Sequence, residues 1–191
     1  ESRHSPVLMR LTTRMAHSRA VVSTGEILEE NQVKFPEPQL ASNWVTLPAN
    51  ARKRVRQLAE DVLAFTADSE NSQDNAFAKG TDNSVGIIAC GIAYNYLMEN
   101  FPDGCPYPVL KVTRYPFPKK QARELASMCS RIIVMEEGQP LIEERLRGLL
   151  YDGDNAALTI SGRLDGTLPR TGELTPDCVR AAVGLAPTGN K

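Results

Sequence analysis

Residues that build metal centres are scarce in this chain, and long apolar runs are missing. Its 191 residues include four cysteines, Cys90, Cys105, Cys129 and Cys178, and no two of them form a CxxC pair. A zinc or iron–sulfur site made by the chain alone is therefore not expected. No uninterrupted apolar stretch approaches the roughly 18 residues that a membrane helix needs. These absences argue against a membrane protein and predict a cytoplasmic one with reduced thiols.

An excess of charge of one sign is also missing. The 22 Lys and Arg residues nearly balance the 23 Asp and Glu residues, so no global basic field attracts nucleic acid or an anionic membrane. The sequence opens on Glu1, with neither an initiator Met nor a charged-then-apolar signal pattern. We therefore interpret the chain as an internal fragment of a longer polypeptide.

The first 83 residues contain little regular structure by their pattern. Residues Pro6 to Thr13 are apolar and partly β-branched, which predicts a strand. Apolar residues at three- and four-residue spacing predict an amphipathic helix over about 48–68. Four basic residues, from Arg52 to Arg56, lie in the N-terminal half of that helix. They form either a solvated helix face or a patch that meets acidic neighbours or a phosphate. The polar stretch that follows, to residue 83, predicts a loop.

From Ser84 onward, short apolar strands alternate with helices of about ten residues. Predicted strands lie in SVGIIACG, VLKVTR, RIIVMEEG and ALTISG, and predicted helices in IAYNYLMENF, PKKQARELASMC and QPLIEERLRGLL. This alternation predicts parallel pairing with right-handed crossovers, and hence a three-layer α/β fold with a mostly parallel sheet. Thr175 as an N-cap and Pro176 in the first turn predict a last short helix.

Glycines flank the first strand of the predicted sheet, in GIIACG. A phosphate-binding loop needs Lys and then Ser or Thr directly after the second glycine, but Ile92 and Ala93 follow Gly91. The GxGxxG fingerprint of dinucleotide-binding domains is absent as well. Gly91 is therefore interpreted as the opening of a tight turn from strand to helix. That turn lies at the carboxyl edge of the sheet, where open α/β folds bind ligands.

Two carboxylates, Glu136 and Glu137, end the third strand at the same edge. Such a pair can act as a general acid and base or bind a cation. More simply, it orders a loop or meets an arginine of a neighbouring subunit. Arg114 and Tyr115 end the preceding strand and are natural partners for these glutamates.

The segment TTRMAHS, residues 12–18, is dense in hydrogen-bonding side chains. It includes Thr13, Arg14, His17 and Ser18. A catalytic triad needs a nucleophile and an oriented base, and adjacency of His17 and Ser18 in sequence does not establish their reach in space. The simpler interpretation is a polar loop that contacts an adjacent domain.

Six segments, taken in order, resemble a known family. They are PVLMRLTTRMAHS, WVTLPANARKRV, SVGIIACGIAYNYLMEN, LKVTRYPFP, IIVMEEGQPLIEERL and RTGELTP. The series resembles the alpha subunit of indolepyruvate ferredoxin oxidoreductase, one of the 2-oxoacid:ferredoxin oxidoreductases. No single motif decides the match, and the likeness is weakest over residues 26–43 and 70–83.

The resemblance implies a division into four parts. Residues 1–24 would end a preceding pyrimidine-binding domain, and residues 25–83 would form a linker that includes the helix. Residues 84–162 would form a transketolase C-terminal-like α/β domain. Residues 163–191 would connect it to a pyrophosphate-binding domain.

The resemblance also implies an activity for the complete enzyme. The family oxidatively decarboxylates aryl pyruvates to acyl-coenzyme A, with coenzyme A as co-substrate and ferredoxin as electron acceptor. Thiamine pyrophosphate, magnesium and 4Fe-4S clusters serve the complete enzyme. Its partners are the other domains of the same polypeptide, a beta subunit and ferredoxin, and a homo-oligomer is compatible with this.

The chain itself carries neither the GDG-type metal–diphosphate motif nor the clustered cysteines of that chemistry. We therefore expect no catalytic residue, bound cofactor or metal on this chain alone, and a structural role at domain interfaces. The interface candidates are Thr13, Arg14, His17, Ser18, Arg114, Tyr115, Glu136 and Glu137. Two alternatives stay open: a stand-alone binding or regulatory module of the same fold, and a part of another thiamine enzyme.

Overall fold

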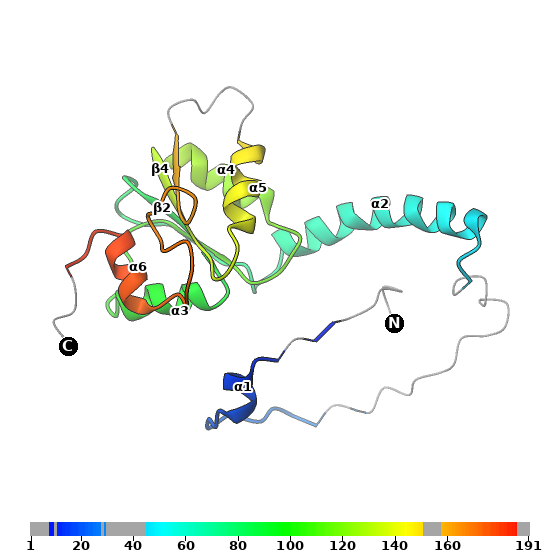
Figure 1. The fold of residues 1–191 in the computed structure, drawn as a ribbon, viewed down its shortest axis with the longest axis horizontal. Coiled ribbons are helices and arrows are strands. Elements are labelled where there is room, and N and C mark those ends of the chain that lie inside the picture. The colour runs from blue at the N-terminus through cyan, green and yellow to red at the C-terminus, as the bar shows by residue number, and fades with distance from the viewer. Residues whose placement is uncertain (1–7, 10, 28, 30–44, 151–157, 187–191) are drawn as a thin grey trace. The chain divides into compact units, whose positions relative to one another are not determined.

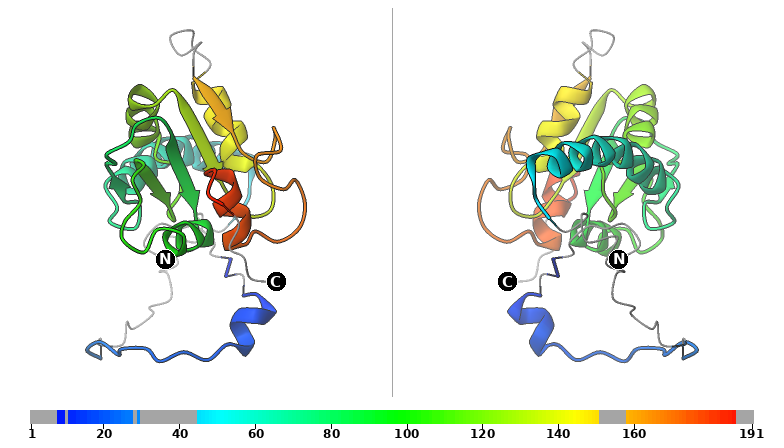
Figure 2. Two further views of the ribbon diagram at one scale, coloured as in Figure 1. Left: turned by 90° about the vertical axis from the view of Figure 1, so that its left-hand side faces the viewer. Right: turned by 90° about the vertical axis from the view of Figure 1, so that its right-hand side faces the viewer.

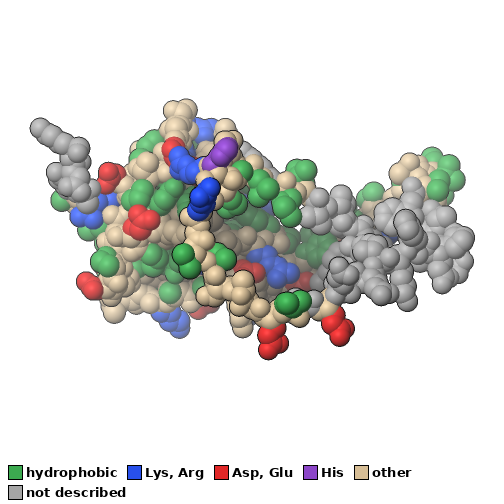
Figure 3. Space-filling model, turned by 90° about the horizontal axis from the view of Figure 1, so that it is seen from below, with side chains coloured by type: hydrophobic (Ala, Val, Ile, Leu, Met, Phe, Trp, Pro, Cys, Tyr) green, Lys and Arg blue, Asp and Glu red, His purple; other side chains and the backbone are tan. Residues whose placement is uncertain are grey.

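The structure is a computed structural model, and it describes residues 8–9, 11–27, 29, 45–150 and 158–186. The chain divides into two compact units, residues 1–45 and 46–191, which we describe separately. Figure 1 traces the elements along the chain. On the face drawn in Figure 3, acidic and basic side chains are interspersed rather than gathered by sign.

The first unit contains one short helix, α1 (Thr13–His17), among its described residues. The strand predicted over Pro6 to Thr13 is wrong where it can be checked, because Leu8, Met9, Leu11 and Thr12 have no strand structure. Its other residues before Thr13 lie outside the described ones. Thr12 instead caps α1, since its hydroxyl accepts a hydrogen bond from the Met15 N–H at 3.3 Å. A polar cap formed within four residues competes with a strand that has no ladder partner among the described residues.

The second unit contains a five-stranded sheet with the order β1-β3-β2-β4-β5. Its parallel strands are β2 (Gly86–Cys90), β3 (Val109–Val112), β4 (Arg131–Met135) and β5 (Thr159–Ser161). The two-residue β1 (Phe77–Ala78) pairs with β3 in the antiparallel direction. The predicted loop before residue 84 therefore contains a short edge strand. The four longer strands and their parallel pairing are confirmed.

Helices cover both faces of the sheet and complete a three-layer α/β architecture (Figures 1 and 2). On one face lie α3 (Ile92–Glu99) and α6 (Pro176–Ala182), and on the other lie α4 (Lys119–Met128) and α5 (Leu141–Leu149). Alternate residues of each central strand point to opposite layers, as a pleated strand requires. Ile87, Ile88, Val112, Ile133 and Val134 are at most 1% exposed, which confirms the predicted core.

A long helix, α2 (Pro48–Glu70), precedes the sheet and begins at a proline, as predicted. Its C-terminal end is fixed by Ser69, whose hydroxyl donates hydrogen bonds to the carbonyls of Arg114 (3.0 Å) and Pro116 (2.6 Å). The Asn75 side chain reinforces this junction, because its Oδ1 accepts from the backbone N–H groups of Thr113 and Arg114. The polar side chains of Ser69 and Asn75 therefore fix the loop after β3.

Candidate functional site

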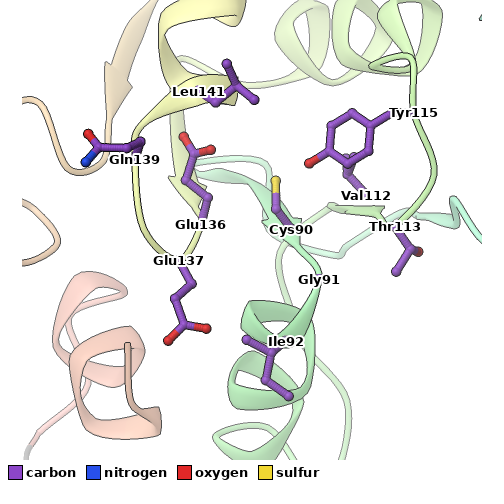
Figure 4. A pocket seen from close by; sticks show the side chains of 10 residues that line it. All are labelled: Cys90, Gly91, Ile92, Val112, Thr113, Tyr115, Glu136, Glu137, Gln139 and Leu141. Atoms are coloured by element: carbon purple, nitrogen blue, oxygen red, sulfur yellow. The ribbon is translucent and has the colours of Figure 1, made fainter. Parts of the chain in front are cut away.

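A crevice of about 410 Å³ opens at the carboxyl ends of β2, β3 and β4 (Figure 4). Adjacent strands β2 and β4 lead to helices on opposite faces of the sheet, so the crevice lies where the connections diverge. Open α/β sheets place ligands at such a point. The lining residues are Cys90, Gly91, Ile92, Val112, Thr113, Tyr115, Glu136, Glu137, Gln139 and Leu141.

Gly91 forms one wall by turning the chain directly from β2 into α3. Its φ of +56° lies in the left-handed region, and its N–H donates to the Val112 carbonyl at 2.9 Å. Any other residue at this position would strain the backbone, although no neighbouring atom would lie within 4 Å of an added Cβ. This confirms Gly91 as the opening of a tight turn at the carboxyl edge of the sheet.

The Glu136 carboxylate is 5% exposed and holds the start of α5. It accepts hydrogen bonds from the backbone N–H groups of Ile142 at 2.9 Å and Glu143 at 3.0 Å. Burial raises the pKa of Glu136, and the nearby Glu143 adds to this, whereas the two N–H donors and Arg163 oppose it. A carboxylate at a helix N-terminus also interacts favourably with the helix dipole. Glu136 therefore orders the turn between β4 and α5.

A pair of buried charged residues, Glu143 and Arg163, lies behind the crevice and connects the β4–α5 turn to the chain after β5. Glu143 is 1% exposed and Arg163 is 2% exposed. Glu143 Oε2 accepts from the backbone N–H groups of Arg163 at 2.8 Å and Leu164 at 3.1 Å. The Arg163 Nε donates to the Glu136 carbonyl at 2.8 Å, and its Nη1 donates to the Pro169 carbonyl at 2.6 Å. The ends of β4 and β5 are thus joined through buried charges.

Two further groups in the crevice have raised pKa values. Burial, followed by the charge of Glu136, raises the pKa of the Cys90 thiol far above its usual range. Burial also raises the pKa of Tyr115 to about 12, helped by Cys90 and Glu136 and opposed by Arg145. In Figure 4 the Cys90 thiol lies between Glu136 and the Tyr115 ring, whereas Glu137 points away from them. A thiol held in this state is a poor nucleophile, so the arrangement suits binding better than nucleophilic attack.

No protein-family model matches the chain. Curated relatives do: the indolepyruvate oxidoreductase subunit IorA of Methanothermobacter thermautotrophicus is 34% identical over 183 residues, which is 93% of this chain. The IorA subunits of Archaeoglobus fulgidus (29% identical) and Pyrococcus abyssi (31% identical) match 95% and 88% of the chain. The chain is a relative of the IorA subunit of indolepyruvate oxidoreductases. It spans only 29%, 28% and 27% of the length of these three proteins.

The structure brings three of the predicted interface residues to the crevice: Tyr115, Glu136 and Glu137. Arg114 is close in sequence but exposed, and its backbone is bound by Ser69 and Asn75. Within the described part of the chain, no hydrogen bond or ion pair joins Arg114 to either glutamate. Glu136 meets the N-terminus of α5 instead, because backbone N–H groups are nearer than a side chain on another strand.

The other four predicted interface residues belong to the first unit. Thr13, Arg14 and His17 lie in α1, and Ser18 follows it, with its hydroxyl donating to the Met15 carbonyl at 2.8 Å. All four are exposed. Their role at an interface with another domain stays a prediction, as does that of the crevice residues.

Sequence reasoning did not find the buried carboxylate Glu143 or its partner Arg163. Gly162 fits the close approach of this carboxylate, because an added Cβ would lie 2.5 Å from Glu143 Oε2, but this contact is visible only in the structure. Among the described residues, no group of three or more His, Cys, Asp or Glu side chains is placed to hold a metal. Over the same residues, no helix has the length and apolar character needed to cross a membrane.

Proposed function

We propose that this chain is a supporting, interface-forming part of a thiamine-pyrophosphate-dependent 2-oxoacid:ferredoxin oxidoreductase. Its sequence relation to IorA subunits over nearly its whole length carries the proposal. The complete enzyme would decarboxylate indolepyruvate or a related aryl pyruvate oxidatively, join the acyl group to coenzyme A and reduce ferredoxin. The sheet domain would correspond to a transketolase C-terminal-like domain, with a beta subunit as a further partner.

The chemistry of the crevice supports a contact role for this chain. Glu136 is bound to α5, and the Cys90 thiol and Tyr115 hydroxyl are held protonated. Glu137 is the exposed carboxylate at the rim. Such a crevice presents hydrogen-bond donors and one accessible negative charge. It therefore suits a positively charged group from another domain of the enzyme or from the beta subunit.

The residues of the crevice do not fit thiamine pyrophosphate. Its diphosphate is held through a magnesium ion, which needs several converging oxygen ligands, and among the described residues no group of three or more His, Cys, Asp or Glu side chains is placed to hold a metal. The cofactor, its magnesium and the iron–sulfur clusters are accordingly assigned to other parts of the enzyme. Isothermal titration of this chain with thiamine pyrophosphate and magnesium should give no binding heat. A micromolar, magnesium-dependent site would contradict the assignment.

The contact role is tested in the full-length subunit, purified with its beta subunit. Reversing the rim charge with Glu137→Lys should lower indolepyruvate-dependent reduction of a viologen dye by about tenfold or more, because like charges at a contact cost several kcal/mol. Glu124→Lys, an equal reversal at an exposed glutamate of α4, is the matched control and should leave the rate unchanged.

Both variants should have the same melting temperature as the wild type when unfolding is followed by circular dichroism. An unaltered rate in Glu137→Lys would remove the crevice from the interface. If the wild-type complex fails to reduce the dye with every aryl pyruvate tested, the proposed oxidoreductase activity itself is wrong.

A further inference from the structure

We propose that α2 is a dimerisation helix, which pairs in antiparallel fashion with α2 of a second copy of this chain. The evidence is an apolar stripe on α2 and a distribution of charge that complements itself. The inference concerns a surface of α2, no residue of which lines the crevice, and it is independent of the proposed oxidoreductase function.

The stripe consists of Ala51, Val55, Leu58 and Val62. Spacings of four, three and four residues place these side chains on one helix face. Val55 is 65% exposed, Leu58 is 52% exposed and Val62 is 44% exposed. Figure 1 shows the N-terminal half of α2 extending away from the sheet. A contiguous exposed apolar face of this kind marks an interaction surface.

The same helix face is already used for packing at its other end. Three residues after Thr66 and seven after Val62 the face reaches Ser69, which is buried against the loop after β3. Val62 and Thr66 line a hollow of about 340 Å³ with Pro116, Phe117 and Leu149. The stripe is thus the continuation of a packed face beyond the edge of the sheet domain.

The distribution of charge along α2 indicates that the stripe is covered by a second copy of this chain. The N-terminal half of α2 carries only basic residues, Arg52, Lys53, Arg54 and Arg56, and the C-terminal half carries only acidic ones, Glu60, Asp61, Asp68 and Glu70. Both halves oppose the helix dipole, which favours acidic residues at the N-terminus and basic ones at the C-terminus. The pattern is therefore not explained by the helix dipole. An antiparallel copy places each basic half beside an acidic half.

The stripe has a matching symmetry. A two-fold axis midway between Arg56 and Gln57 places Val55 beside Leu58 of the second copy, and Ala51 beside its Val62. Every stripe residue then meets another, and the contact is isologous and closed.

The flank of the stripe also complements itself. Arg54 and Asp61 are seven residues apart and so lie on the same flank of α2. The two-fold axis places this flank along the same flank of the second copy, so Arg54 of each chain lies near Asp61 of the other. Opposite charges that flank an apolar seam set partner choice and orientation.

Two effects limit the affinity. The contact involves about three turns of each helix, which is at the low end for a specific interface. Lys119 and Arg145 line the hollow toward which the basic N-terminus of the second α2 points, so they repel it. We therefore expect a dissociation constant on the order of 10–100 µM at low salt.

Sedimentation equilibrium of the 191-residue chain between about 5 and 500 µM tests the pairing. The mass should rise from 21.0 kDa toward twice that value. Leu58→Asp should abolish the rise. Leu63→Asp is the matched control, because Leu63 is 73% exposed on the same helix but lies off the stripe, and its variant should still dimerise.

Charge reversal tests the orientation. Arg54→Asp and Asp61→Arg should each weaken dimerisation by about tenfold or more, since each creates like-charged neighbours. The double variant Arg54→Asp/Asp61→Arg should restore it to within about threefold of the wild type. A wild-type chain that stays monomeric at the highest concentration, equal effects of Leu58→Asp and Leu63→Asp, or a double variant as weak as the single ones would each overturn the inference.

Discussion

Replacing Glu143 with alanine should destabilise the sheet domain by about 2–5 kcal/mol. Glu143 Oε2 accepts two backbone N–H groups, those of Arg163 and Leu164, and both lose their partner in the variant. The buried Arg163 donor left without a partner costs about 1–3 kcal/mol, and the part-buried Leu164 donor costs less. The lost ion pair with Arg147 adds little, because the Arg147 side chain is 41% exposed and interacts with water.

Glu143→Gln is the matched control for this prediction. Its side-chain oxygen can take the place of Oε2 and keep both backbone hydrogen bonds. Its amide nitrogen then faces Arg147, which can turn into the solvent. We expect this variant to lose no more than about 1.5 kcal/mol.

Urea unfolding followed by circular dichroism at 222 nm measures both losses. The midpoint should fall strongly for Glu143→Ala and slightly for Glu143→Gln, with the m-value unchanged in both. Equal losses for the two variants would show that packing volume, and not the pair of backbone donors, sets the cost. A loss below about 1 kcal/mol for Glu143→Ala would show that the donors find other partners.

Three further predictions concern the core, pH and the first unit. Ile133→Ala should cost about 2–5 kcal/mol in the same urea assay, as a large-to-small change at a fully buried position does; a loss below about 0.5 kcal/mol would contradict its place in the core. Burial raises the pKa of Asp165, but its hydrogen bonds outweigh this and lower it to about 2, so its stabilising effect is present above its unfolded pKa and disappears as the pH falls through 3.8 toward 2. Because Asp165 is exposed, Asp165→Asn should cost at most about 1 kcal/mol at pH 7 and nothing at about pH 2, and a cost independent of pH would be the contrary result. In the full-length enzyme, Arg14→Ala and His17→Ala should lower viologen reduction while circular dichroism of this chain stays unchanged; full activity in both variants would leave this segment without an interface role.

The sheet was predictable because its strands are short apolar runs between Gly and Pro turns. Ile132, Ile133 and Val134 are buried, and such an uninterrupted apolar run is typical of a parallel sheet covered on both faces. The final helix was predictable for the same reason: the Thr175 hydroxyl accepts a hydrogen bond from the Cys178 N–H at 3.3 Å, as an N-cap residue should. Local signals of this kind do not depend on distant parts of the chain.

Features that rest on distant partners could not be predicted in the same way. β1 has two residues in a polar stretch and exists only because Phe77 and Ala78 pair with Leu110 and Val109. Conversely, residues before Thr13 have a strand-like composition, but the described ones have no ladder to join. In the crevice, sequence order placed Glu136 and Tyr115 at one edge of the sheet. It did not indicate that α5 would bind the carboxylate.

The buried charges behind the crevice have a consequence for how the rim can act in an assembly. Glu136 binds the start of α5, and Arg163 binds the carbonyl of Glu136 while its own N–H binds Glu143. Any movement of the β4–α5 turn would therefore break several buried hydrogen bonds at once, each costly to leave unmade. The rim that presents Glu137 is held in place before any partner arrives, which spares the entropy of ordering it on contact. A preformed rim of this kind favours a rigid contact between domains over a loop that closes on a substrate.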